Sequence, residues 1–185
     1  MEFIEVELKY DADAIKLRDF KKLINDSFSN IRWQEVASWD DYFVDKSQDF
    51  MRYRHNEHQN QLTLKKKMSD VNNNKRIEVN LDLEKNSFAT VSKFAELQGY
   101  KHNFKIFKWC DIAWLEKVNI VYYIVQDDEL HEKRRFIEIE ANESYNWKSE
   151  EEAMEEVVKI EKLLEPLGIS PQNRLRKSLF EMYQK

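Results

Sequence analysis

The feature that most constrains this chain is a series of short segments in which charged and apolar residues alternate. In the first segment Glu5, Glu7 and Lys9 share one face of an extended strand, and the apolar residues between them share the other face. The alternation recurs in four later segments, where it pairs Arg52 with Arg54, Lys65 with Lys67, Arg76 with Glu78, and Glu138 with Glu140. Each segment therefore predicts a strand with one charged face.

For any single strand, contact with water is enough to explain a charged face. Five such strands favour a sheet that closes with helices on its apolar side, so that the charged face lines a lumen. We therefore predict an α+β fold in which about eight strands close into a barrel, with helices inserted between them and appended. The 185 residues contain no repeat and no linker, and we expect a single domain over 1–185.

Hydrophobic spacing and turn residues place the individual elements. Helical spacing predicts helices over 14–28, 88–97 and 153–164, with a last helix opened by Ser170 and Pro171. Asp11 or Asp13 can cap the first helix, and Ser87 and Ser149 can cap the next two. Strands are expected over 2–10, 42–44, 50–54, 62–67, 76–83, 103–113, 117–127 and 134–142.

Composition narrows the classes of function. A net charge of -5 argues against general nucleic-acid binding, and two glycines leave no glycine-rich phosphate loop. The lone Cys110 excludes an intrachain disulfide and fits a reducing compartment, so we expect a cytoplasmic protein. No apolar run reaches membrane-spanning length. We expect no membrane or nucleic-acid partner, a small-molecule substrate, and a monomer or homodimer.

The charged residues themselves indicate a ligand class. Carboxylate oxygens suit hard divalent cations, and Mg²⁺ combines few protein carboxylates with substrate phosphates. Arginine forks and lysine ammonium groups match phosphate oxygens. Four glutamates and five or six cations that converge in one lumen therefore predict a site for a polyphosphate and its metal ions. The four histidines lack metal-ligand spacing and are expected at the surface.

In order and spacing these motifs resemble the CYTH superfamily, the triphosphate tunnel metalloenzymes, over nearly the whole chain. The Glu-x-Glu-x-Lys strand at Glu5 opens that pattern, and Glu138-x-Glu140 closes it. Between and after them stand residues similar to the family's basic and acidic positions: Arg52, Arg54, Lys65, Arg76, Glu78, Lys108, Asp128 and Lys177. Cys110 replaces an arginine that is usual two residues after the lysine at 108.

The resemblance implies an α+β fold, an eight-stranded antiparallel β-barrel (a tunnel) with flanking helices. It also implies metal-dependent hydrolysis of a triphosphate that is inorganic or carries a nucleoside or thiamine. It implies that Glu5, Glu7, Glu138 and Glu140 hold Mg²⁺ or Mn²⁺, and that Glu78 or Asp128 orients the attacking water. Phosphate binding would then fall to Lys9, Arg52, Arg54, Lys65, Arg76, Lys108 and Lys177. Two alternatives stay open: an adenylyl cyclase of the class IV type that makes cyclic AMP from ATP, and a polyphosphate-binding module without turnover.

Overall fold

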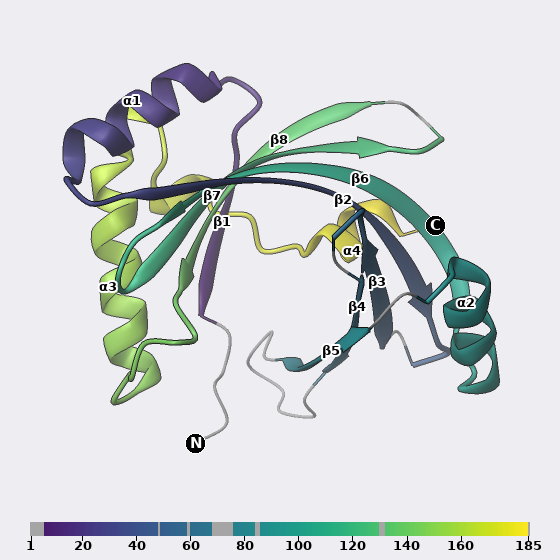
Figure 1. The fold of residues 1–185 in the computed structure, drawn as a ribbon. Coiled ribbons are helices and arrows are strands. Elements are labelled where there is room, and N and C mark those ends of the chain that lie inside the picture. The colour runs from purple at the N-terminus through teal and green to yellow at the C-terminus, as the bar shows by residue number, and fades with distance from the viewer. Residues whose placement is uncertain are drawn as a thin grey trace. The chain divides into compact units, whose positions relative to one another are not determined.

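The computed structural model describes residues 6–47, 49–58, 60–67, 76–83, 86–129 and 132–184, and for 66–67 and 76–78 it describes the backbone alone. Its strands are β1 (Glu7–Asp11), β2 (Arg32–Val44), β3 (Phe50–His55), β4 (Asn60–Lys67), β5 (Arg76–Leu83), β6 (Lys101–Trp114), β7 (Val118–Asp127) and β8 (Lys133–Ala141). Its helices are α1 (Leu17–Ser27), α2 (Phe88–Leu97), α3 (Glu150–Leu163) and α4 (Leu179–Tyr183) (Figure 1).

All eight strands belong to one sheet, in the order β1-β8-β7-β6-β2-β3-β4-β5. The ladders between β1 and β8, β7 and β8, β2 and β3, β3 and β4, and β4 and β5 are antiparallel. The eight-stranded α+β fold is thus confirmed. The strand order is that of an open sheet, however, because among the described residues it ends at β1 and at β5.

The chain divides into two compact units, each built from separate stretches of sequence. Unit 1 comprises Met1–Val36, Trp109–Gln126 and Glu132–Ser178, and unit 2 comprises Ala37–Lys108, Asp127–His131 and Leu179–Lys185. Strands β2 and β6 contribute residues to both units. The expectation of a single domain stays a prediction.

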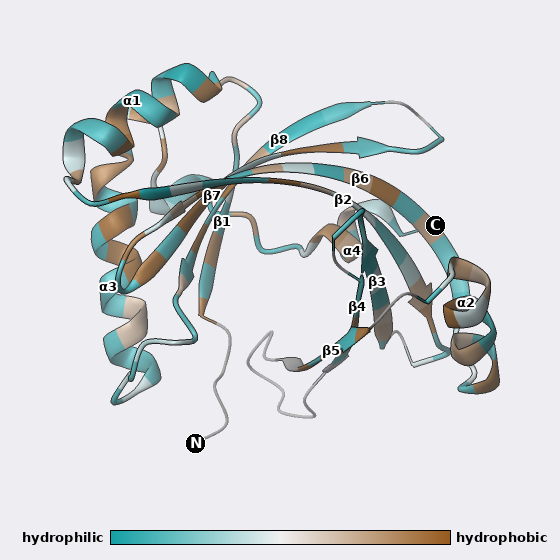
Figure 2. Cartoon of the chain, viewed as in Figure 1, coloured by the Kyte–Doolittle hydropathy of each residue, from teal (hydrophilic) through white to brown (hydrophobic). Residues whose placement is uncertain are grey.

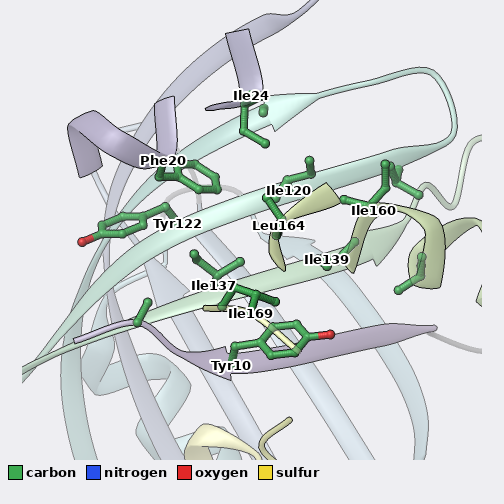
Figure 3. Close-up of a cluster of buried hydrophobic side chains, with 14 of the residues drawn as sticks. Tyr10, Phe20, Ile24, Ile120, Tyr122, Ile137, Ile139, Ile160, Leu164 and Ile169 are labelled. Carbon is green, nitrogen blue, oxygen red and sulfur yellow. The ribbon is translucent and has the colours of Figure 1, made fainter. Parts of the chain in front are cut away.

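The core of unit 1 lies between its strands and the helices α1 and α3. The apolar face of β8 supplies Ile137 and Ile139, and Phe20 of α1 and Ile160 of α3 pack against the same cluster (Figure 3). Alternation along β1 sends Tyr10 into this core while Lys9 points to the other face. Helices α1 and α3 each combine hydrophobic and hydrophilic residues, as expected for helices with one buried face (Figure 2).

One buried acid joins α3 to the C-terminal segment and to β1. Glu161 is 1% exposed and accepts a hydrogen bond from the Tyr10 hydroxyl at 2.7 Å. Arg174 donates to the same carboxylate through Nε at 2.6 Å, and the Leu175 amide bonds to the Lys9 carbonyl at 2.7 Å. Glu161 therefore fixes the strand that carries Glu7 and Lys9 from its apolar side.

The core of unit 2 is smaller and lies under α2. Val91 and Ala95 of that helix pack against Met51, Tyr53 and Leu62 of β3 and β4. Ser87 caps the helix as predicted by accepting a hydrogen bond from the Thr90 amide, and Gly99 ends it with φ of +86°.

Three local expectations differ from the structure. Helix α1 starts after Lys16, which makes no side-chain cap, so neither Asp11 nor Asp13 caps it. The strand predicted over 42–44 is much longer, because β2 already begins at Arg32. The last predicted helix is wrong: Pro171–Asn173 is a 3₁₀ turn, and α4 begins only at Leu179. None of the described helices is both long and apolar enough to cross a membrane.

Candidate cation site and phosphate-binding face

The carboxylates predicted to hold a metal meet on the polar face of unit 1. In the antiparallel register Glu7 of β1 stands opposite Glu140 of β8, and Lys9 stands opposite Glu138. One carboxylate oxygen from each of Glu7, Glu138 and Glu140 lies within 4.8 Å of the other two. Glu5, the fourth predicted ligand, lies outside the described residues. This donor set of carboxylates fits a hard divalent cation such as Mg²⁺ or Mn²⁺.

Lys9 balances part of this negative charge. Its Nζ lies 2.9 Å from Oε1 of Glu138 and 3.6 Å from Oε1 of Glu7, and the lysine is buried. An opposite charge at such short range offsets part of the repulsion between the two glutamates. The ionised carboxylates are the form that binds a cation.

Tyr123 of β7 is a member of this site that sequence analysis missed. Its hydroxyl donates a hydrogen bond to Oε1 of Glu138 at 2.8 Å, and its side chain is fully buried. Burial first, and then the charge of Glu138, raise the pKa of Tyr123 well above its ordinary value of 10. The tyrosine therefore stays protonated and remains a donor to Glu138.

The predicted phosphate-binding residues of β3 and β4 share one face of unit 2. Arg52 stands opposite Tyr42 on β2 and Thr63 on β4, and it donates a hydrogen bond to the Thr63 hydroxyl at 3.1 Å. Lys65 belongs to the same face, where its charge acts on Tyr42. Lys108 of β6 is buried and lies close enough to lower the pKa of Asp40.

Asp40 lies among the basic residues of this face, and the sequence did not predict its role there. It is fully buried, and Arg54 donates to both of its oxygens at 2.8 Å. Burial alone raises the pKa of Asp40, but Arg54, and then Arg52 and Lys108, lower it more strongly, to about 2. Arg54, a predicted phosphate ligand, is thus already paired with Asp40. The sequence did not predict this pairing.

Aromatic residues border the same face. Tyr42 stacks on Phe104 with ring centroids 4.4 Å apart, and Phe50 stacks on Phe180 of α4 at 4.5 Å. Burial, followed by the charge of Asp40, raises the pKa of Tyr42 to about 12. Tyr42 therefore contributes a neutral hydroxyl to a face whose other polar groups are mostly charged.

The remaining predicted site residues have different surroundings. Asp128 is exposed at the turn after β7 and lines a cavity of about 450 Å³ together with Asp41, His55 and His102. Asp41 is buried and pairs with both histidines, at 3.1 and 2.9 Å, so these two histidines are not isolated surface residues. Because Asp40 and Asp41 are neighbours in a strand, their side chains point to opposite faces. The structure thus groups Asp128 with Asp41 rather than with the arginines.

Three further residues stay predictions. Arg76 and Glu78 lie in β5, where Glu78 stands opposite Lys65 and Arg76 opposite Lys67, but their side chains lie outside the described part of the chain. Lys177 was expected on the last helix, but it is exposed at a bend before α4.

Comparisons with known proteins bear on the fold. No family model matches the sequence, and no curated protein matches it. Among solved structures, a conserved hypothetical protein from Pyrococcus furiosus superposes with a TM-score of 0.70 at 24% identity, over 96% of this chain and 98% of that one. A putative adenylate cyclase from Vibrio parahaemolyticus gives 0.68 at 14% identity, over 98% of both chains.

A third solved structure with a similar fold is described as a triphosphatase. The Pct1 RNA triphosphatase of Schizosaccharomyces pombe superposes with a TM-score of 0.53 at 14% identity, over 91% of this chain and 77% of that one. The fold is the CYTH fold. At these identities the likeness shows the architecture alone.

Proposed function

We propose that this CYTH-fold protein is a divalent-cation-dependent triphosphatase that hydrolyses inorganic triphosphate or an organic triphosphate. The observation that carries the proposal is the convergence of Glu7, Glu138 and Glu140 on one face of unit 1, with carboxylate oxygens within 4.8 Å of one another. Three carboxylates held this close repel one another unless a cation lies between them. Lys9 supplies only one positive charge to the cluster.

The glutamates of unit 1 and the basic residues of unit 2 have separate roles in this proposal. Glu7, Glu138 and Glu140 hold Mg²⁺ or Mn²⁺, which supplies charge neutralisation to the phosphates when bound. Arg52, Lys65 and Lys108 bind phosphate oxygens, and Asp40 orients the guanidinium of Arg54. Lys9 positions Glu138, and with a cation present its ammonium group can turn to a phosphate oxygen.

A cyclase is the second candidate, favoured by the structural similarity to two proteins described as putative adenylate cyclases, from Vibrio parahaemolyticus and Bacillus halodurans. The same donors would serve it, with a ribose hydroxyl as the nucleophile in place of water. Nothing in the side chains described above separates these two reactions, because neither nucleophile belongs to the protein.

The test is a product assay with tripolyphosphate, ATP, thiamine triphosphate and a simple phosphate monoester at one Mg²⁺ concentration. We expect phosphate release from at least one triphosphate and almost none from the monoester, since each added phosphate meets another cation. Cyclic AMP formed from ATP would make the cyclase the correct function. Tight tripolyphosphate binding without any product would leave a polyphosphate-binding module.

A further inference from the structure

Asn119 of β7 carries a buried side-chain oxygen on the strand next to β8. It stands directly opposite Glu140 in the ladder between β7 and β8. The next residues, Val118 and Ile120, belong to the apolar core of unit 1, so alternation sends Asn119 to the face that carries the glutamates. The ladders place Glu7, Glu140 and Asn119 in one row across three adjacent strands.

The side-chain oxygen of Asn119 has no partner among the described residues. Asn119 is 8% exposed, and its Oδ1 is closed to solvent and accepts no hydrogen bond. Buried amide oxygens are nearly always satisfied, so one that is not calls for a partner such as a water molecule or an ion. Residues opposite one another in an antiparallel pair have Cβ atoms about 4.5–5.5 Å apart, so the side chains of Asn119 and Glu140 are neighbours on this face.

An anion or a second acceptor would be repelled at this position, because Glu140 and Glu7 already bring negative charge to the row. A cation would accept the lone pair of the amide oxygen, and it would also offset the repulsion between the carboxylates of Glu7 and Glu140. Amide oxygens are among the neutral donors that complete the oxygen shells of hard divalent cations.

We propose that Asn119 is a fourth oxygen donor of the cation site, alongside Glu7, Glu138 and Glu140. This inference rests on the proposed function, in which those three glutamates hold a divalent cation. The neutral donor adds a ligand without adding charge, and so it strengthens cation binding without adding to the repulsion in the metal-free protein.

The role predicts opposite effects of one substitution on two properties. Asn119→Ala removes a ligand and should raise the Kd for Mn²⁺ about tenfold, in the range typical of residues around a metal site. It also removes a buried acceptor without a partner, so the melting temperature of the metal-free protein should be unchanged or raised by about 2–4 °C. A residue that only supports the fold would instead lose stability.

The experiment is an Mn²⁺ titration of the full chain followed by electron paramagnetic resonance, in which free Mn²⁺ gives the signal, together with thermal unfolding in EDTA. Asn119→Asp keeps the oxygen donor and should bind Mn²⁺ at least as tightly as the parent. Gln126→Ala is the control, because it removes a side-chain amide near the opposite end of β7. It should change neither the Kd for Mn²⁺ nor the melting temperature.

The outcomes separate this inference from the proposed function. If the parent binds no Mn²⁺, or Glu140→Gln leaves its binding unchanged, the cation site itself is wrong and the inference falls with it. If Glu140→Gln weakens binding but Asn119→Ala does not, the cation site stands and the role of Asn119 is overturned. A lower melting temperature of metal-free Asn119→Ala overturns that role as well.

Discussion

The buried pair of Asp40 and Arg54 makes a quantitative prediction about acid stability. The pKa of Asp40 in the folded protein is about 2, against an ordinary value of 3.8. At 1.36 kcal/mol per pKa unit, this difference corresponds to about 2 kcal/mol of folding free energy. Because the folded pKa is the lower one, the contribution is complete above about pH 5 and is lost as the pH falls toward 2.

The change to make is Asp40→Asn, which keeps the size of the side chain and removes its charge. The free energy of unfolding should fall by about 2 kcal/mol at pH 7 and by much less near pH 2. Urea unfolding curves of the parent and the variant between pH 7 and pH 2 measure both values. Other carboxylates titrate in the same range in both proteins, so the difference between the two curves isolates Asp40.

Arginine variants supply the matched control. Arg54→Ala leaves a fully buried carboxylate without its bidentate partner and should cost about 3–5 kcal/mol. Arg52→Ala removes the bond to Thr63 but leaves Asp40 paired with Arg54, so it should keep the fold while raising KM for a triphosphate. The reasoning is refuted if Asp40→Asn changes stability equally at pH 7 and pH 2, or if the two arginine variants are equally unstable.

Two further outcomes are expected from unit 1. Glu138→Gln should lower kcat by at least about 100-fold, which is more than the loss typical of residues that only support a metal ligand. Circular dichroism should show an intact fold, because the glutamine side chain still accepts the hydrogen bond from Tyr123. Glu161→Gln should lower the free energy of unfolding by about 3 kcal/mol in urea, because it weakens a buried pair with Arg174, whereas exposed Glu155→Gln on the same helix should change it by less than about 0.5 kcal/mol.

Much of the fold could be predicted because the strands have a strict period of two. The strand 76–83 alternates without interruption, and β5 has these same bounds. The same alternation predicted that Glu7, Glu138 and Glu140 share a face, and they meet there. A face is fixed by local geometry, so a single sequence is enough to predict it.

The parts that were missed depend on register and on tertiary partners. Asn119 and Tyr123 lie in a strand that is apolar on both faces, where periodicity cannot separate one face from the other. The role of Asp40 depends on its pairing with Arg54, which lies fourteen positions away in the chain and is brought close by the strand register. Ser170 and Pro171 open a 3₁₀ turn with the same signal that opens a longer helix, so the predicted last helix was wrong.

The pairing of β1 with β8 also limits how this sequence can change by insertion and deletion. Apolar Leu8 and Tyr10 alternate with Glu7 and Lys9, so one residue gained or lost inside the strand would exchange its two faces. The Glu7 carboxylate would then enter the packed interior, and Tyr10 would enter the charged face. Length variation among descendants of this chain should therefore gather in the turns, while both strands change by substitution alone.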